Sequence, residues 1–534
     1  FLVNKLYYDA YKKDMTAGTY PDVRSGLQKL LKDGLLLFNY TGHGGTTALS
    51  DEKVLTQTDI NQFTYTHLPV WVTATCDFTR FDDLNTSAGE DVFLNKSSGG
   101  IALFTTVRVA YSRPNFPIND NVIRNLFERN NGRRRTLGEV MQATKNTLSS
   151  VYKLGFCLIG DPAVKIAYPE FGMKVTTVNG QSVDGNSISF KALEKITVEG
   201  EVLDVSGQLV TDFTGIVNPT VKDSKVTVTC LKNSNKDDSP AFTFTDYPNT
   251  IFIGNDSVRN GKFSFTFTVP KDISYSNLQG KMNLYAVDTE SGNEAQGNFD
   301  NFIVGGTSDT AETDTIGPEI RALYLNDTTF VDGGQVNTTP YFVAELWDKS
   351  GVNITGSSVG HDMMLVIDES TVLSYNLNSY YELLPGEDGT GIVKFPIPAL
   401  EPGKHTAEFW VWDILNNSTV RTFTFEVVEG LKPFLFDVIA TPGIAREQVT
   451  FHLMHNRPES RMRVGIMVYD LAGRQLWKHE ESGTSGLFEN YTVSWDLTSG
   501  GARMRPGVYI YRAAISTDNS KDATKARKFI ILGE

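Results

Sequence analysis

Two apolar segments, 35–45 (LLLFNYTGHGG) and 69–78 (PVWVTATCDF), decide how the first part of the chain folds. Both are rich in large or β-branched apolar residues, which is typical of strands buried on both faces of a parallel sheet. The first segment leads into His43 and the second into Cys76. Functional side chains in such sheets lie just beyond the carboxyl ends of the strands. The pattern therefore predicts that His43 and Cys76 form a base and nucleophile pair.

Helical segments alternate with strands as far as about residue 168. Apolar residues at helical spacing predict helices at 1–13 and 21–33, and Gly34 is well placed to end the second helix. Ser87 and Thr136 are each followed three residues later by glutamate, which is the capping-box pattern at the start of a helix. Because strands and helices alternate, we expect a parallel α/β sheet in this part of the chain.

The remainder of the chain has the pattern of all-β domains. Short alternating segments are separated by glycine, asparagine, aspartate and serine, and a polar linker (GGTSDTAETDT) occupies 305–315. We therefore predict a multidomain protein, in which an α/β domain with a parallel sheet precedes three all-β immunoglobulin-like sandwiches. The predicted domains are 1–168, 169–306, 315–430 and 432–534.

Composition excludes several classes of protein. The net charge of −14 argues against nucleic acid as a partner, because phosphate binding needs a basic surface. No segment approaches the roughly 20 apolar residues that a membrane-spanning helix requires. The three cysteines, Cys76, Cys157 and Cys230, do not form a disulfide framework, and we expect the last two to be buried and inert. Because Phe1 begins inside a predicted helix with no signal peptide, we expect a fragment or a processed form.

Several motifs resemble those of the gingipain-like cysteine peptidases. NYTGHGG, VTATC and FCLIGDPAVKIAYP resemble the catalytic domain of that family, in which the histidine precedes the cysteine. CDFTRFDD and TTVRVAYS are closer to its type IX secretion sortase branch. MVYDLAGRQLW, VSWDL, RPGVYIYRA and KFIIL resemble the C-terminal signal domain of type IX secretion cargo, although ATPGIAREQ is a degenerate form of the usual opening of that domain. The resemblance covers nearly the whole chain and implies a caspase-like (gingipain-type) catalytic domain. It also places the acidic partner of the histidine and the base of the specificity pocket upstream of Phe1.

The residues around the pair suggest further roles. Cys76 is the expected nucleophile, and His43 the base that later protonates the leaving amine. The N–H groups of Gly44 and Cys76 would form the oxyanion hole. Asp77, Arg80 and Arg108 are candidates for substrate binding, with a solvated salt bridge or structural pairing as the alternative.

We expect no metal site and no cofactor from the residue spacing. His361 and Asp362 are adjacent, but no second histidine or carboxylate has a suitable spacing. DDLN (82–85) lacks the regular spacing of a calcium loop, although the resemblance leaves a structural calcium ion possible. His452 and His455 fall on opposite faces of one predicted strand. The run Arg133–Arg135 is better explained as a solvated basic loop than as a site for lipopolysaccharide phosphates.

The resemblance implies a cell-surface cysteine transpeptidase on the outer membrane of a Gram-negative bacterium. Such a sortase removes the C-terminal signal domain of secreted cargo through a thioester and transfers the cargo to an amine of lipopolysaccharide. Its partners would be cargo proteins, lipopolysaccharide, an outer-membrane β-barrel protein and other subunits of a surface attachment complex. Two alternatives remain: a secreted endopeptidase that uses water as the acceptor, and a surface binding protein with a vestigial pair.

Overall fold

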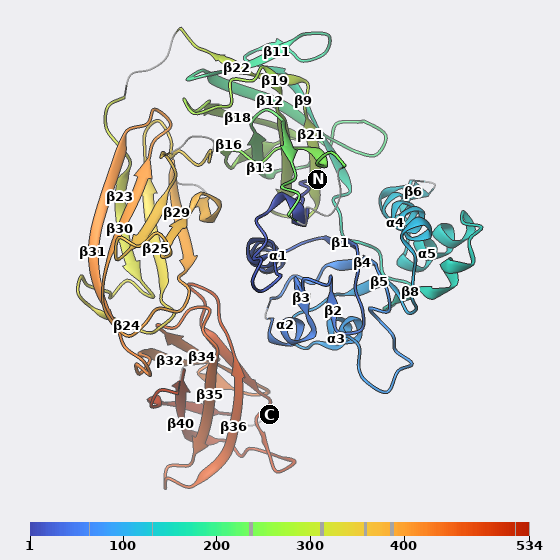
Figure 1. Cartoon of the computed structure of the whole chain (residues 1–534). Coiled ribbons are helices and arrows are strands. Elements are labelled where there is room, and N and C mark those ends of the chain that lie inside the picture. The colour runs from blue at the N-terminus through green and yellow to red at the C-terminus, as the bar shows by residue number, and fades with distance from the viewer. Residues whose placement is uncertain are drawn as a thin grey trace.

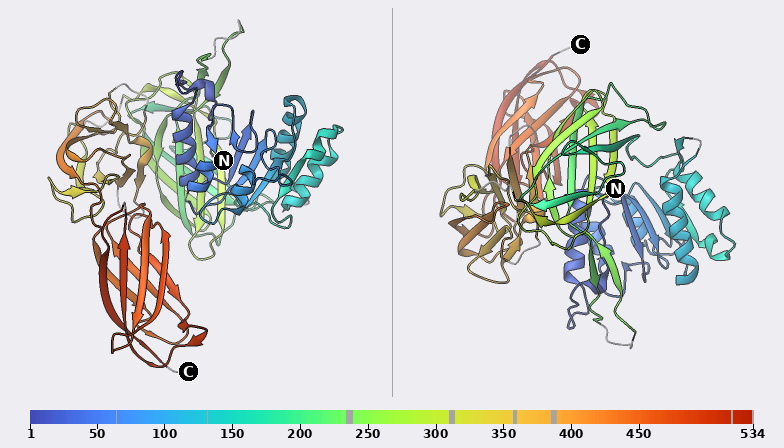
Figure 2. Two further views of the ribbon diagram at one scale, coloured as in Figure 1. Left: turned by 60° about the horizontal axis from the view of Figure 1, so that its bottom comes forward. Right: turned by 90° about the horizontal axis from the view of Figure 1, so that it is seen from above.

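The computed structural model describes residues 1–63, 65–130, 132–233, 239–309, 314–356, 360–384, 389–517 and 519–532. The predicted linker at 305–315 lies partly outside these ranges. One α/β region is followed by three regions built from strands, so the protein is multidomain and mostly β (Figure 1). In the left view of Figure 2 the C-terminal strands, coloured red, extend away from the rest of the molecule.

The α/β region contains a four-stranded sheet with the order β1-β4-β5-β8. These strands are β1 (Leu37–Thr41), β4 (Val70–Ala74), β5 (Ala102–Thr106) and β8 (Phe156–Ile159). The first three are parallel, but β8 runs antiparallel to β5, so the prediction of an entirely parallel sheet is wrong at its last strand. Two successive helices connect β5 to β8 and return the chain to the end of the sheet at which β5 leaves it.

Helices cover both faces of this sheet. The helices α1 (Pro21–Asp33), α2 (Gln57–Gln62) and α3 (Ala88–Leu94) share one hydrophobic core with the sheet. The helices α4 (Ser112–Phe127) and α5 (Leu137–Asn146) pack on the other face against β4 and β5. Both predicted capping boxes are present, and Gly34 caps α1 with a φ of 102°. Whereas β4 and β5 are buried on both faces, β1 alternates, with Asn39 and Thr41 exposed. The expectation of a fully buried first strand is therefore wrong, because β1 lies at the edge of the sheet.

The helix predicted at 1–13 is absent, and the only helical turn there is η1 (Tyr8–Ala10). Tertiary contacts replace it. The ring of Tyr7 packs against Phe242 and Phe244, and Asp9 accepts hydrogen bonds from the backbone N–H groups of Lys232 and Asn233. The local helical pattern is therefore overridden by packing on the following β region.

Each β region has its own hydrophobic core. The cores span Met173 to Val304, Leu325 to Val427 and Leu435 to Ile531. Each region is built mainly from a larger and a smaller sheet, with the orders β10-β9-β12-β18-β17-β13-β20-β21 and β11-β22-β19, then β24-β31-β30-β26-β27 and β23-β25-β29-β28, and then β33-β41-β40-β35-β36 and β32-β34-β37. The immunoglobulin-like character of these regions stays a prediction.

The remaining elements have the following bounds. In the α/β region they are β2 (Ala48–Leu49), β3 (Leu55–Thr56), β6 (Arg129–Asn130), β7 (Arg133–Arg134) and η2 (Val151–Gly155). The first β region contains β9 (Phe171–Val178), β10 (Gln181–Ser182), β11 (Ile188–Ala192), β12 (Lys195–Leu203), β13 (Gly215–Lys222), β14 (Val226–Thr229), β15 (Thr243–Asp246), β16 (Thr250–Ile253), β17 (Asp256–Arg259), β18 (Lys262–Thr268), β19 (Leu278–Gln279), β20 (Lys281–Asp288), β21 (Glu294–Phe299) and β22 (Phe302–Thr307). The second contains β23 (Glu319–Leu325), β24 (Gln335–Val336), β25 (Tyr341–Trp347), β26 (Met364–Ile367), β27 (Ser374–Asn376), η3 (Asn378–Tyr380), β28 (Tyr381–Leu383), β29 (Thr390–Pro396), β30 (Gly403–Trp412) and β31 (Ser418–Val427). The third contains β32 (Leu435–Thr441), β33 (Ile444–Ala445), β34 (Val449–His455), β35 (Met462–Tyr469), β36 (Gln475–Gly483), β37 (Tyr491–Trp495), β38 (Thr498–Ser499), β39 (Ala502–Arg503), β40 (Gly507–Ser516) and β41 (Ala523–Ile531).

Helix α1 connects the α/β region to two of the β regions. The Nζ atom of Lys32 lies 2.7 Å from a carboxylate oxygen of Glu459, and Lys29 lies over the ring of Tyr380. Among the described residues, no helix combines the length and the apolar character needed to cross a bilayer.

Candidate active site

Strands β1 and β4 bring His43 and Cys76 to the same end of the sheet. In the parallel pairing of these strands, Tyr40 lies opposite Thr73 and Thr41 lies opposite Ala74. The same offset relates His43 to Cys76, two residues beyond the last pair. The two side chains therefore follow neighbouring positions at the carboxyl edge, where parallel sheets place their functional groups.

The turn that carries His43 is fixed through its backbone. The carbonyl oxygen of His43 accepts hydrogen bonds from Ser50 N–H at 2.8 Å and from the Tyr40 hydroxyl at 2.6 Å. Tyr40 is buried, and burial raises the pKa of its hydroxyl, so this donor stays protonated. The imidazole of His43 itself is exposed. The turn is therefore held in place while its side chain remains available.

Gly44 places this turn directly against the strand end that carries the cysteine. A Cβ atom at Gly44 would lie 2.5 Å from Thr75 Oγ1 and 3.2 Å from the carbonyl oxygen of Ala48. Real Cβ atoms almost never approach another atom that closely. Glycine is therefore required here by close packing against the residue that precedes Cys76.

Cys76 is half-buried, and its thiol contacts the connection between β5 and α4. Its Sγ atom donates to the carbonyl oxygen of Ala110 at 3.1 Å and lies 3.4 Å from the N–H of the same residue. A catalytic thiol needs partial exposure together with a nearby base. The environment of Cys76 meets the first condition, and the β1–β4 pairing brings His43 to the same edge of the sheet.

Two backbone N–H groups at this edge of the sheet, those of Gly44 and Cys76, have no acceptor among the described residues. Within the described part of the chain, neither Gly44 N–H nor Cys76 N–H donates a backbone or side-chain hydrogen bond. An oxyanion hole needs donors that the fold leaves unused, because they bind the negative oxygen of the tetrahedral intermediate. These two groups can fill that role.

The other three candidate residues lie on the segments that flank Cys76. Arg108 pairs with both carboxylate oxygens of Asp82, at 3.0 and 2.5 Å, and this contact raises the pKa of Arg108 and lowers that of Asp82. Arg80 pairs more loosely with Asp83, at 3.5 Å. Asp77 has a left-handed backbone with a φ of 48°, and one of its carboxylate oxygens is buried without a hydrogen-bond partner. The side chains of the two arginines are thus engaged within the protein, whereas the carboxylate of Asp77 forms no ion pair among the described residues.

Most residues outside this site for which we expected a structural role have one. Cys230 is buried, which raises its thiol pKa, but Cys157 is only half-buried because it lies on β8 at the edge of the sheet, so the expectation of full burial is wrong there. Arg133, Arg134 and Arg135 each form an ion pair, respectively with Glu139, Glu170 and Glu128. The basic run is therefore neutralised by the protein itself.

His361 contacts Asp272 at 2.8 Å, and His455 accepts a hydrogen bond from Arg457 N–H and contacts Ser485.

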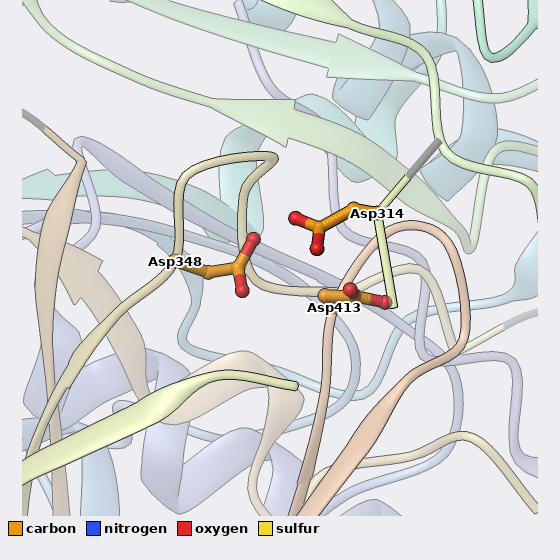
Figure 3. Close-up of side chains that lie close together, drawn as sticks. All are labelled: Asp314, Asp348 and Asp413. Carbon is orange, nitrogen blue, oxygen red and sulfur yellow. The ribbon is translucent and has the colours of Figure 1, made fainter. Parts of the chain in front are cut away.

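Three carboxylates that sequence spacing did not identify converge in the second β region. Asp314, Asp348 and Asp413 each offer an oxygen within 4.8 Å of the others, and Figure 3 shows them pointing toward one another from separate segments. Burial, followed by the neighbouring carboxylates, raises the pKa of Asp348 to about 6, and burial also raises the pKa of Asp413. An all-oxygen donor set suits a hard cation such as calcium. The three aspartates lie far apart in the sequence. The only local sequence feature that points to the cluster is a Trp-Asp pair that occurs twice (347–348 and 412–413).

Comparison with known proteins agrees with the sequence motifs. Residues 1–167 match the sequence model of Peptidase family C25. The crystal structure of dimeric latent PorU from Porphyromonas gingivalis is 37% identical over 77% of this chain and 39% of the PorU chain, with a TM-score of 0.34. The crystal structure of the Arg-specific cysteine proteinase gingipain R is 18% identical over 53% of this chain and 56% of that chain, with a TM-score of 0.26.

The chain thus spans about two fifths of PorU and just over half of the gingipain. No match was found among the curated proteins. The family match covers the same α/β region that positions His43, Gly44 and Cys76. Residues 1–167 therefore match the gingipain-like cysteine peptidases of family C25.

Proposed function

We propose that this chain carries out acyl transfer at Cys76, with His43 as the base. The observation that carries the proposal is the convergence of the 43–45 turn on the residue before Cys76, beside two unused backbone N–H groups. His43 would remove the thiol proton, and the thiolate would attack the carbonyl carbon of a peptide bond. The N–H groups of Gly44 and Cys76 would bind the resulting oxyanion. His43 would then protonate the leaving amine, leaving an acyl thioester on Cys76.

We further propose that the acceptor of this acyl group is an amine rather than water, which makes the protein a sortase-type transpeptidase. The sequence similarity to PorU and the signal-like motifs after residue 466 support this reading. The substrates would be cargo proteins with type IX C-terminal signal domains, and the acceptor an amine of lipopolysaccharide. The protein would act at the cell surface, peripherally attached to the outer membrane through an outer-membrane β-barrel protein and other subunits of the attachment complex.

The test incubates the protein and its Cys76→Ala variant with a cargo signal-domain substrate and an excess of a glycine peptide. Mass spectrometry then identifies the new carboxyl end of the cleaved cargo. Glycine-capped product that the variant cannot form supports transpeptidation at Cys76. Hydrolysed product alone, with lipopolysaccharide as well as with the glycine peptide, favours a secreted endopeptidase. If neither protein cleaves the cargo, the remaining interpretation is a surface binding protein.

A further inference from the structure

Among the described residues, the carboxylate of Asp77, the residue directly after the nucleophile, has no hydrogen-bond donor and no ion-pair partner. Its Oδ1 atom is shielded from solvent and accepts no hydrogen bond. Among the residues that the structure describes, no lysine, arginine or histidine nitrogen forms a salt bridge with it. Its backbone N–H, in contrast, donates to the carbonyl oxygen of Arg108 at 3.3 Å, so the position of the residue is fixed.

The cationic side chains of Arg80 and Arg108, on the neighbouring segments, are already paired with other acids. Arg108 binds both oxygens of Asp82, and Arg80 faces Asp83. Asp77 is still close enough to Arg108 to raise its pKa, although Asp82 contributes more. The flanking segments therefore pair their arginines with Asp82 and Asp83, and among the described residues the carboxylate of Asp77, which follows Cys76 in the chain, forms no salt bridge.

This arrangement is costly in the free protein. A buried carboxylate oxygen without a donor loses its hydration and gains nothing in return. A left-handed backbone at a residue other than glycine adds strain, and such strain is concentrated at functional sites. Asp77 as a whole is half-buried, and a ligand with a positive charge and N–H donors that reached its carboxylate would remove the first of these costs.

We propose that Asp77 binds a cationic nitrogen group of a substrate beside the thiol of Cys76. The proposal rests on the acyl-transfer function above and names the substrate chemistry of the same site. The cation has two possible sources: a lysine or arginine side chain next to the scissile bond, or the acceptor amine. In the second case the ammonium first gives one proton to His43, and the freed nitrogen lone pair forms the C–N bond with the thioester carbon. The C–S bond breaks, its electron pair returns to sulfur, and sulfur takes a second proton from nitrogen, so the products are the amide, the free thiol and protonated His43.

The variant for the test is Asp77→Asn, because asparagine tolerates the left-handed backbone and removes only the charge. The matched control is Asp83→Asn, which removes a carboxylate from the same loop. One arm measures the rate of Cys76 acylation by cargo substrates with lysine, arginine or glutamine next to the scissile bond. The other arm measures how the acyl-enzyme partitions between water and either methylamine, a cation at pH 7.5, or hydroxylamine, which is neutral there.

A loss in Asp77→Asn that is confined to basic cargo assigns the site to the cleaved polypeptide. A loss that is confined to methylamine assigns it to the acceptor. We expect one of these losses to be about threefold to tenfold, as for one charge removed at short range in a partly solvated site. Equal behaviour of Asp77→Asn and Asp83→Asn in both arms overturns the proposal.

A third measurement needs no peptidase activity, so that failure of the acyl-transfer function can be distinguished from failure of this proposal. Cys76 is modified with a trimethylammonium-bearing or a neutral methanethiosulfonate, and peptide mass spectrometry separates its reaction from that of Cys157. The proposal predicts that the cationic reagent loses its rate advantage in Asp77→Asn and keeps it in Asp83→Asn. An unchanged ratio in Asp77→Asn contradicts an unpaired carboxylate beside the thiol.

Discussion

Replacing Gly44 with alanine tests the geometry of the proposed oxyanion hole. The new Cβ atom would lie 2.5 Å from Thr75 Oγ1 and 3.2 Å from the carbonyl oxygen of Ala48, so the turn must move away from β4. Overpacking of this kind costs about 1–3 kcal/mol of unfolding free energy. Displacement of one oxyanion donor lowers turnover by roughly 100-fold to 1,000-fold. We therefore expect turnover in Gly44→Ala to fall by roughly 100-fold to 1,000-fold, together with a loss of about 1–3 kcal/mol of unfolding free energy.

The assay follows cargo cleavage and thermal unfolding in three further variants. Gly45→Ala is the control in the same turn, because a Cβ there meets no atom within 4 Å, and we expect it to retain activity. Thr75→Ala removes the buried hydroxyl that would clash with the new Cβ atom and that has no hydrogen-bond partner of its own. The double variant Gly44→Ala/Thr75→Ala should therefore recover much of the lost activity. Full activity in Gly44→Ala, or an equal loss in Gly45→Ala, would refute the reasoning.

Three further predictions concern stability. Asp348→Asn should raise the melting temperature, measured in EDTA, more at pH 7.5 than at pH 4. The pKa of Asp348 is about 6 in the folded protein against the ordinary 3.8, so ionisation of this carboxyl removes up to about 3 kcal/mol of stability as the pH rises through this range. A lower melting temperature of the variant at pH 7.5 contradicts this prediction. Glu139→Gln should make the free energy of unfolding, measured by chemical denaturation, less sensitive to acid between about pH 4.5 and 2. Arg133 and the helix cap lower the pKa of Glu139 to about 2, so the contribution of this carboxylate to stability is lost as the pH falls through this range. An unchanged pH profile of the unfolding free energy counts against this prediction. Thr105→Val should cost about 2 kcal/mol in urea unfolding, because the buried hydroxyl of Thr105 bonds two other threonine hydroxyls that would lose their partner; a neutral effect would mean that these hydroxyls find other partners.

Local sequence signals predict much of the α/β region because they act within one element. The capping glutamates, the glycine that ends α1 and the buried runs of β4 and β5 each fix their own segment. The failures come from tertiary context. The segment 1–13 packs on β15 and on the residues that follow β14 instead of forming a helix, and β8 reverses its direction because two helices precede it.

The same division applies to the site. The spacing of His43 and Cys76 follows from two adjacent parallel strands, so it can be inferred from their two buried runs. The contact between Gly44 and Thr75 depends on how closely two loops approach, which no local pattern encodes. The Asp314–Asp348–Asp413 cluster joins three segments through the folding of the second β region, and its members are separated by up to a hundred residues.

The most direct test of the central claim is to trap the acyl-enzyme. The protein is mixed with a cargo signal-domain substrate, quenched in acid within seconds and analysed by peptide mass spectrometry, alongside Cys76→Ala and His43→Ala. We predict a thioester adduct on the peptide that contains Cys76, absent from Cys76→Ala and strongly reduced in His43→Ala. An adduct on Cys157 or Cys230 instead, or undiminished cleavage by Cys76→Ala, would contradict the assignment of Cys76 as the nucleophile.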